Sequence, residues 1–414
     1  MNDHDAMAAQ AAIAARVGGF YETHPYPPPF DDIEPYRRAW GEARRRADAH
    51  LFWPREPFRD DRTILVAGCG TSQAAHYAVR WPRARVAGID VSENSIAFER
   101  ELRQKHSLEN LELRRLEVER AGELGQTFDY IVCTGVLHHL ADPAAGLKAL
   151  SAVLAPGGAM HVMVYAPFGR AGIYLLQEYC RRLGIGWTGE EIDELAATLK
   201  ALPRDHPLAP LLARSPDFAT TAGLADALLH PNDRAYSVPQ FMEFLHGAGL
   251  SFGRWVRQAP YLPQCGAPAQ TPHRARLAAL PVEEQHAAVE LFRGTMVRHA
   301  AVVYAAGAPM RDYPAAFSGE VWANYVPIRL PGTTVVKERL PAGAAAVLIN
   351  RNHADTDLYL PIDGERLRMF EAIDGERTAG EVSRLAGDRN AARDFFRQLW
   401  EWDEVVFDES RVPR

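Results

Sequence analysis

The sequence predicts an α/β fold with a mostly parallel sheet, followed by a smaller α+β unit. Two observations support this prediction. Between residues 63 and 165, short β-favouring runs alternate with stretches of helical periodicity, which is typical of a parallel sheet covered by helices on both faces. Beyond residue 311, short β-like runs are followed by three helical stretches and a last strand.

Each element of the alternating part has its own signal. Strands are expected at residues 63–67, 85–91, 111–118, 128–134 and 159–165, and helices at 73–81, 93–106 and 143–154. Asp142 suits the N-cap of the third helix and Pro143 its first helical position. Pro156-Gly157-Gly158 is expected to end that unit.

The alternation stops after Tyr165. Residues from about 169 to 235 are helix-rich and interrupted by prolines, which indicates a helical insertion. Ser237 and Gln240 then predict a capping box at the start of a helix, with strands from about 250 and up to 307. The last unit is expected to hold strands at 333–340, 345–350 and in "EVVFD", and helices at 367–373, 379–385 and 391–400.

These patterns predict three regions. Residues 1–55 would form an N-terminal helix and an aromatic arm, because the proline-rich segment 20–36 favours an extended chain over a helix. Residues 56–310 would form the α/β domain with its insertion, and residues 311–414 an accessory domain.

Composition narrows the classes of function. The net charge of −7 over 414 residues argues against broad binding to nucleic-acid backbones. We find no apolar run near the roughly 18 residues of a membrane helix, and the acidic N-terminus is a poor signal peptide. The four cysteines are far apart and fit no metal site. A cytoplasmic protein without a membrane or nucleic-acid partner is therefore expected.

The stretch "ILVAGCGTSQ" resembles half of a cofactor site. Gly68 and Gly70 follow a buried strand, and without a Cβ their main chain can approach a ligand closely. A helix starts just after them and would point its free N–H groups at the turn. A simple tight turn between strand and helix is the alternative.

A second feature favours a nucleoside ligand. Asp90 ends the next strand about twenty residues later, where a carboxylate can accept both ribose hydroxyls of an adenosine. An N-cap role for Asp90 is the alternative, although Ser92 could fill it equally. Because Ser72 stands where a dinucleotide turn carries its third glycine, S-adenosylmethionine is favoured over a dinucleotide.

At this point the motifs resemble a known family. "ILVAGCGTS", "GIDVS", "FDYIVCTGVLHHLADPAAGLKALSAVLAPGG" and "MVYAP" are similar to the successive motifs of class I S-adenosylmethionine-dependent methyltransferases. The likeness is greatest to bacterial members with a YxxxPYP arm, here Tyr21 to Pro27, and it covers roughly residues 20–307. It implies a Rossmann-like core with a mostly parallel seven-stranded sheet, and S-adenosylmethionine as the methyl donor.

The resemblance also implies roles for individual residues. Gly68, Cys69 and Gly70 would lie along the methionine part of the cofactor, Asp90 at the ribose, and Val91 and Glu117 near the adenine. Thr134, Gly135 and Val136 would line the sulfonium. Because the strand lacks an acid at Val66, a main-chain carbonyl near Ala67 or Gly68 would hold the cofactor's ammonium group. For Glu117, an ordinary exposed charge is the alternative.

Five tyrosines and two histidines are the remaining candidates for the cofactor lid and the acceptor side. His138 or His139 would take a proton from the acceptor, or both would be structural. Tyr21 and Tyr26 would close over the cofactor and the acceptor, or they would only tie the N-terminal helix down. Tyr165 and Tyr236, and also Tyr261, would line the acceptor pocket or belong to the core.

The C-terminal region weakly resembles the peptide-binding winged-helix domains of ribosomal-peptide tailoring systems. Such domains add a peptide as an extra strand at a sheet edge. Acidic residues in "DGERTAGE" and "WEWDE" disfavour DNA, while peptide binding and homodimerisation both stay open. The expected enzyme is thus an O- or N-methyltransferase acting on a peptide, a protein or a small metabolite. A catalytically silent cofactor-binding module and a nicotinamide-dependent oxidoreductase are the alternatives.

Overall fold

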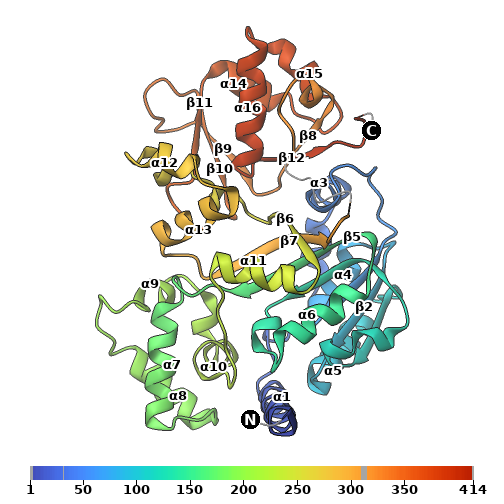
Figure 1. The fold of residues 1–414 in the computed structure, drawn as a ribbon, viewed down its shortest axis with the longest axis vertical. Coiled ribbons are helices and arrows are strands. Elements are labelled where there is room, and N and C mark those ends of the chain that lie inside the picture. The colour runs from blue at the N-terminus through green and yellow to red at the C-terminus, as the bar shows by residue number, and fades with distance from the viewer. Residues whose placement is uncertain (1–2, 31, 309–314, 413–414) are drawn as a thin grey trace. The chain divides into compact units, whose positions relative to one another are not determined.

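The computed structural model describes residues 3–30, 32–308 and 315–412, and Figure 1 shows the order of its elements. The chain folds into two compact units. The first takes the described residues of 1–39, 61–250 and 294–300, and the second those of 40–60, 251–293 and 301–414. These boundaries differ from the predicted regions, which place residues 40–55 with the N-terminal arm and 251–293 with the α/β core.

A seven-stranded sheet organises the α/β part. Its order is β3-β2-β1-β4-β5-β7-β6, and β3-β2-β1-β4-β5 pair in parallel. The strands are β1 (Thr63–Ala67), β2 (Arg85–Asp90), β3 (Leu111–Arg115), β4 (Phe128–Thr134), β5 (Leu154–Tyr165), β6 (Leu250–Trp255) and β7 (Arg298–Ala305). The predicted fold class, with its mostly parallel seven-stranded sheet, is confirmed.

The strand order also locates the place where a ligand is expected. The chain goes from β1 outward to β2 and β3, and then returns to β4 on the other side of β1. In open α/β sheets, ligands bind beyond the carboxyl ends of the strands at such a reversal. A ligand is therefore expected at the loops that follow β1 and β4.

Three helices between these strands start at the residues predicted for them. They are α4 (Gln73–Arg80), α5 (Glu93–Lys105) and α6 (Pro143–Ala152). Ser92 Oγ accepts the N–H of Ser95 at 3.1 Å, and Asp142 Oδ1 accepts that of Ala145 at 3.0 Å. Both side chains satisfy N–H groups that a helix start leaves unpaired.

Two strand boundaries differ from prediction. β3 ends at Arg115, and residues Val118–Leu124 form a 3₁₀ helix instead of continuing the strand. β5 starts at Leu154, so the Pro156-Gly157-Gly158 segment lies inside the strand. Gly157 takes a positive φ of 76° there, and the pairing of β4 with β5 shifts register between Phe128 and Tyr130. The strand accommodates the turn-forming residues as an irregularity.

The N-terminal arm is shorter than predicted. Helix α1 (Asp3–Thr23) includes Phe20, and α2 (Glu34–Ala39) includes Tyr36, so helices occupy both ends of the segment 20–36. The prolines begin only at Pro25, and the residues before them are free to stay helical. Phe20 is fully buried, with its ring centroid 5.7 Å from that of Trp187.

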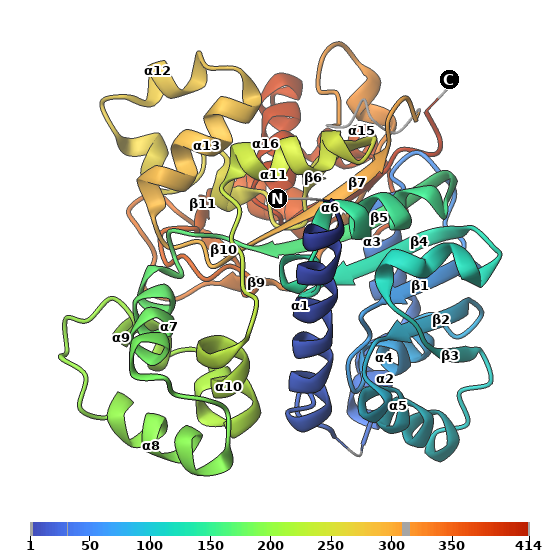
Figure 2. The same ribbon diagram turned by 60° about the horizontal axis from the view of Figure 1, so that its bottom comes forward.

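The insertion is helical, as expected. It contains α7 (Ala171–Leu183), α8 (Gly189–Leu199), α9 (Ala209–Leu212) and α10 (Thr221–Leu229), and α11 (Val238–Gly247) follows it. Phe20 of α1 joins the apolar cluster of these helices, which includes Ile173, Leu195 and Leu224. Figure 2 shows α1 between the insertion helices and α5.

The second unit combines two small antiparallel sheets with helices. Its sheets have the orders β11-β10-β9 and β12-β8. The elements are α3 (Glu42–Phe52), α12 (Arg274–Ala278), α13 (Val282–Arg293), β8 (Val326–Arg329), β9 (Thr333–Val336), β10 (Ala346–Asn350), β11 (Leu360–Ile362), α14 (Gly364–Glu371), α15 (Ala379–Val382), α16 (Arg389–Glu401) and β12 (Val405–Asp408). The main-chain N–H of Glu409 donates to Pro54 O at 2.6 Å, which ties the segment after α3 to the end of β12. The resemblance to a winged helix stays a prediction.

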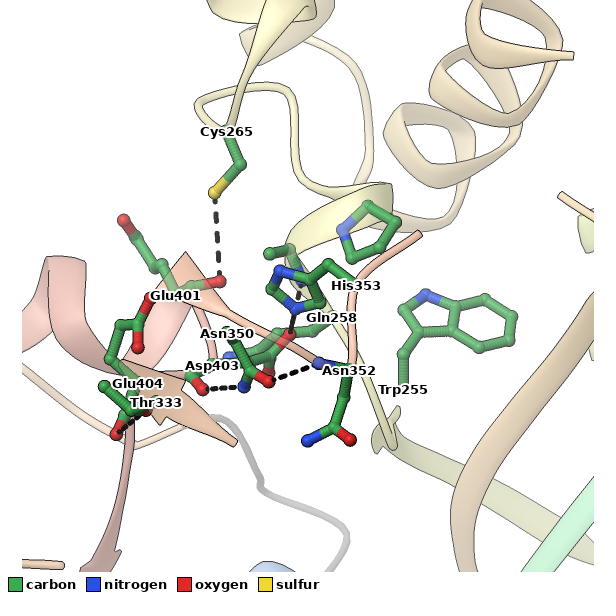
Figure 3. Close-up of polar contacts among 12 residues, drawn as sticks. Trp255, Gln258, Cys265, Thr333, Asn350, Asn352, His353, Glu401, Asp403 and Glu404 are labelled. Atoms are coloured by element: carbon green, nitrogen blue, oxygen red, sulfur yellow. Dashed lines mark hydrogen bonds and ion pairs between the residues drawn. The ribbon is translucent and has the colours of Figure 1, made fainter. Parts of the chain in front are cut away.

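A buried acid organises the core of this second unit (Figure 3). Asp403 Oδ1 accepts from the guanidinium of Arg254 at 2.9 Å, and Oδ2 lies 3.0 Å from His353 Nε2. Oδ2 also accepts the N–H of Ala259 at 2.9 Å. Asp403 has a left-handed φ of 56°, which is unusual for a residue with a side chain. One carboxylate thus joins three segments distant in sequence.

Within the described residues, none of the helices combines the length and hydropathy that would let it span a bilayer. The four cysteines are buried and form no disulfide.

Candidate active site

A cavity of about 470 Å³ lies in the first unit, at the carboxyl ends of β1 and β4. Most of the predicted site residues line it. They are Tyr21, Tyr26, Gly68, Cys69, Gly70, Asp90, Val91, Glu117, Thr134, Gly135, Val136, His139 and Tyr165.

Three predicted site residues do not line the cavity. Ala67 is fully buried at the end of β1. His138 is also fully buried, with its ring centroid 3.9 Å from that of Tyr165, so it lies behind the wall. Tyr236 stacks on Phe244 at 5.0 Å, away from the cavity.

The conformation of the glycine turn is set by the chain's own packing. Gly68 and Gly70 have positive φ values of 71° and 55°. A Cβ on Gly68 would lie 2.3 Å from Val136 Cγ2, and one on Gly70 would lie 2.7 Å from the carbonyl oxygen of Tyr26. The two glycines therefore allow the loop after β4 and the N-terminal arm to close against the turn.

The start of helix α4 differs from expectation. The N–H groups of Ala74 and Ala75 do not face the turn but donate to the Glu99 carboxylate, at 2.7 and 2.9 Å. Glu99 is fully buried, and this burial raises its pKa to about 8. The spacing within the turn does not reveal this carboxylate, because it comes from the middle of α5.

Asp90 is held in place by the main chain around it. Its Oδ2 accepts the N–H of Gly70 and its Oδ1 that of Ser92, both at 2.9 Å. Burial raises the pKa of Asp90, while these N–H groups favour its charged form. Each oxygen keeps a second lone pair for a ligand hydroxyl. The alternative role as N-cap of α5 falls to Ser92, whose Oγ accepts the N–H of Ser95.

An apolar wall lies beside Asp90. It combines Val91, Leu116 and Val118 with Ala14 and Val17 of helix α1. This part of the cavity suits a flat apolar group such as an adenine ring. Glu22, near the end of α1, fixes the helix there because its carboxylate accepts the N–H of Glu93 at the start of α5, at 2.7 Å.

A polar part of the cavity carries three tyrosines. The hydroxyl of Tyr21 donates to Asp226 at 3.1 Å, and that of Tyr26 donates to Asp217 at 2.9 Å. Tyr165 OH lies 3.5 Å from Asp226. Burial, and then the nearby carboxylates, raise the pKa of each tyrosine, so all three stay hydroxyl donors near neutral pH.

Arg170 provides a positive charge in this part of the cavity. Its guanidinium pairs with Asp233 at 3.0 Å and lies 3.5 Å from the ring centroid of Tyr165. Both charged groups are buried, so each depends on the other for compensation.

Several lining residues were not anticipated from the sequence. They are Ala14 and Val17 of α1, Arg170, Asp217 and Asp226 of the insertion, and Val297 and Arg298 at the start of β7. No local motif marks them, because each reaches the cavity through tertiary packing.

Comparison with known proteins identifies the core. A family model described as a methyltransferase domain matches residues 65–160, the span from β1 into β5. Residues 65–160 are a methyltransferase domain. The predicted methyltransferase core is thereby confirmed.

Relatives extend beyond this domain. An uncharacterised protein of Synechococcus is 31% identical over 257 residues, covering 58% of this chain and 60% of that protein. A ubiquinone biosynthesis O-methyltransferase of Acinetobacter baumannii is 29% identical over 157 residues, covering 38% of this chain and 60% of the relative. The matched region thus spans about 60% of the length of these curated relatives.

A solved structure shares the fold of nearly the whole chain. PKMT2 from Rickettsia typhi superposes over 93% of this chain and 77% of its own, with a TM-score of 0.63 and 17% identity. The same protein was also solved in complex with AdoHcy, with a TM-score of 0.60 to this chain. At this identity the likeness concerns the fold.

Proposed function

We propose that this protein transfers a methyl group from S-adenosylmethionine to an oxygen or nitrogen nucleophile. The observation that carries the proposal is the cavity at the carboxyl ends of β1 and β4, within a methyltransferase domain. It joins a fixed strand-end carboxylate, an apolar wall and a polar part with titratable groups. An adenosyl group fits the first two features, and an acceptor with a hydroxyl or amine fits the third.

The cofactor would be held by residues on three loops. Asp90 would accept the ribose hydroxyls, and Val91 and Leu116 would flank the adenine. The main chain of Gly68 and Gly70 would follow the methionine part, with Thr134, Gly135 and Val136 beside the sulfonium. Glu117 stays a candidate for the adenine amino group, since it lines the same wall.

When bound, the cofactor supplies a methyl group on a sulfonium, whose sulfur leaves as a neutral thioether. The chain's own contribution is alignment and exclusion of water. Helix α1, Tyr21 and Tyr26 wall the cavity from the N-terminal side, and the tyrosines are fixed by Asp226 and Asp217. His139 is the base on the wall, and it takes the proton that the acceptor loses as the new bond to carbon forms.

The acceptor could be a small metabolite or a side chain of a peptide or protein. The name of the Acinetobacter relative favours an oxygen nucleophile on a small molecule. The C-terminal resemblance favours a peptide or a protein, and pairing with a second copy of this chain is the other role considered for that region. A protein that binds the cofactor without transferring a methyl group is the alternative function.

Calorimetric titration with S-adenosylmethionine and with S-adenosylhomocysteine tests the binding step. We expect micromolar binding, weakened at least tenfold by Asp90→Ala, since each lost charge-assisted hydrogen bond costs roughly 1.5–3 kcal/mol. Glu112→Ala, an exposed carboxylate on β3, is the matched control and should leave affinity unchanged. No heat with either ligand from folded protein would overturn the proposal.

A second experiment separates the enzyme from a silent binding module and identifies the acceptor class. Cell extract from a strain lacking the gene is fractionated into small molecules and macromolecules, and each fraction is incubated with labelled methyl donor. Label in the small-molecule fraction indicates a metabolite, and label in the macromolecular fraction indicates a peptide or protein. Binding of the cofactor with no transfer to either fraction would support the silent module.

A further inference from the structure

Two buried histidines lie in contact with each other, and one of them, His139, lines the cavity. His139 follows β4 and His230 follows α10, and their ring centroids are 3.8 Å apart. Their exposed fractions are 2% and 8%. Within the described part of the chain, the Nε2 atom of neither ring has a hydrogen-bond partner. Two polar nitrogens left unpaired at such depth call for a chemical role.

A single residue determines the tautomer of both rings. His139 Nδ1 lies 2.9 Å from the carbonyl oxygen of Asn232, which can only accept, so Nδ1 carries the proton. The N–H of Asn232 donates to His230 Nδ1 at 3.1 Å, so this Nδ1 carries none. In its neutral form, His139 therefore presents a lone pair at Nε2, and His230 presents an N–H there.

The side chain of Asn232 holds the two segments together. Its amide nitrogen donates to the carbonyl oxygens of His139 and Leu140, at 3.0 and 2.9 Å. The loop after β4 and the segment after α10 are thus joined by three hydrogen bonds of this one residue. Such second-layer contacts are what fix the orientation of a catalytic imidazole.

We propose that Asn232 positions the two rings of a proton-transfer site. In this site His139 Nε2 is the base, and His230 presents a hydrogen-bond donor, its Nε2–H. This assignment rests on the methyl transfer proposed above. As the acceptor oxygen or nitrogen bonds to carbon, its proton passes to His139 Nε2. His139 then carries a proton on each nitrogen, with Nδ1–H still donating to Asn232.

Asp226 is placed to stabilise that charge. Its carboxylate is 4% exposed and groups with the two rings so closely that one ligand atom of each residue lies within 4.8 Å of the others. Tyr21 donates to it at 3.1 Å, which fixes its orientation. A negative carboxylate this near attracts the positive charge that forms on the imidazole ring as the proton is transferred.

The same three side chains could in principle hold a metal ion. Asn232 argues against this use, because its N–H on Nδ1 leaves the proton of neutral His230 on Nε2, the nitrogen that a metal would need. The rings also lie in direct contact, with their centroids 3.8 Å apart and an interplanar angle of 36°. The geometry therefore favours proton transfer over coordination.

Nuclear magnetic resonance of the ¹⁵N-histidine-labelled full-length protein tests the assignment without any cofactor or acceptor. We expect His139 to be protonated at Nδ1 and His230 at Nε2, each as the predominant tautomer. The resonances are assigned with His139→Gln and His230→Gln. His246, which is exposed on α11, is the internal reference for a ring whose tautomers exchange freely. The opposite tautomer on either ring would overturn the proposal.

Asn232→Ala tests the positioning role. It should lower the ratio of the Nδ1–H to the Nε2–H tautomer of His139 about tenfold, toward the ratio in His246. The reason is that the side-chain hydrogen bonds that hold the main-chain carbonyl of residue 232 against Nδ1 are lost. Asn94→Ala is the matched control, since the Asn94 amide also donates to a main-chain carbonyl, that of Glu22, at 2.7 Å. An unchanged ratio in folded Asn232→Ala would refute the positioning role.

A titration of the wild-type protein with Zn²⁺ decides between the two uses of the cluster. The proposal predicts that the Nε2 resonances of both rings stay in place. Stoichiometric binding that shifts both resonances would instead show a metal site and overturn it. The tautomers are measured in the free protein, so a failure of this proposal can be told apart from a failure of the proposed methyl transfer. A variant that does not fold leaves the wild-type spectrum as the deciding measurement.

Discussion

At the scale of single residues, the glycine turn owes its sequence to packing as much as to any ligand. Gly68 and Gly125 have nearly the same backbone conformation, with φ values of 71° and 67°. They differ in their surroundings, because a Cβ on Gly125 would have no neighbour within 4 Å, whereas one on Gly68 would collide with Val136. Alanine at Gly125 therefore tests backbone strain alone, whereas alanine at Gly68 tests backbone strain together with a steric clash.

We expect Gly125→Ala to lower the free energy of unfolding by about 1–2 kcal/mol, the cost of a left-handed residue with a side chain. Gly68→Ala should cost clearly more, and the additional Val136→Ala substitution should recover part of the difference. Urea unfolding of the three variants measures this. Equal losses for Gly68→Ala and Gly125→Ala would contradict the steric argument.

Glu99 makes stability depend on pH. Its folded-state pKa of about 8 lies above its ordinary value of 4.5, so the folded protein holds a proton that the unfolded chain releases. The contribution is fully present below pH 4.5 and is lost as the pH rises to about 8, by up to roughly 1.4 kcal/mol per pH unit. Relative to wild type, Glu99→Gln should therefore become more stable as the pH rises through this window.

Thermal unfolding of both proteins between pH 5 and 8 checks this expectation. Glu112→Gln, on the exposed face of β3, should show a constant difference from wild type over the same range. A difference between Glu99→Gln and wild type that does not change with pH would mean that Glu99 is ionised throughout.

Asp403 has a comparable importance in the second unit. Its carboxylate is 2% exposed and faces Arg254, also 2% exposed, as well as His353. Removing one partner of a buried ion pair typically costs about 3–5 kcal/mol. We expect Asp403→Ala to destabilise the protein by that amount in urea unfolding. Asp394→Ala, whose side chain is 44% exposed on α16, should change stability by less than about 0.5 kcal/mol.

At the scale of elements, a feature could be predicted from the sequence when the contact that determines it joins residues close together in the chain. Ser92, Asp142 and the Ser237–Gln240 box predict helix starts because each contacts a residue three positions ahead. The glycine turn, the strand-end acid Asp90 and the loop after β4 belong to the same class of local signal. These features account for most of the sheet and for part of the cavity wall.

The rest of the site depends on contacts between distant segments. Tyr21 reaches Asp226 across 205 positions, and Asn232 reaches His139 across 93. No pattern in either segment specifies its partner. For the same reason, His138 and His139 are equivalent in the sequence, and only the fold places one on the wall and the other behind it. The tertiary packing of α1 and the insertion decides the acceptor end.

Helix α1 is the element on which the cavity wall most depends. Phe20 anchors it among the insertion helices, while Val17 and Ala14 face the cavity. Phe20→Ala would remove a fully buried ring, at a cost of about 3–5 kcal/mol. We expect it to weaken S-adenosylhomocysteine binding at least tenfold and to make α1 sensitive to limited proteolysis.

The control is Ala12→Ser, on the exposed face of the same helix, which should alter neither property. Unchanged affinity in Phe20→Ala, with α1 cleaved faster, would mean that the helix is a structural strap and not part of the cofactor wall.

At the scale of the whole molecule, the two compact units carry different kinds of buried polar chemistry. The first has titratable groups around a cavity, and the second has a closed network around Asp403. Ligand binding should therefore stabilise the molecule unevenly. A ligand at 100 times its dissociation constant adds about 2.7 kcal/mol to the stability of the folded state that binds it.

Hydrogen exchange with S-adenosylhomocysteine at that excess measures where the added stability appears. We expect slower exchange in residues 14–27, 64–72, 89–92 and 134–141, which border the cavity. Exchange in β10 and α16 of the second unit should stay the same, because no cavity residue belongs to either element. Protection confined to β10 and α16 would place the ligand elsewhere, and Asp90→Ala should reduce the protection around the cavity at the same ligand concentration.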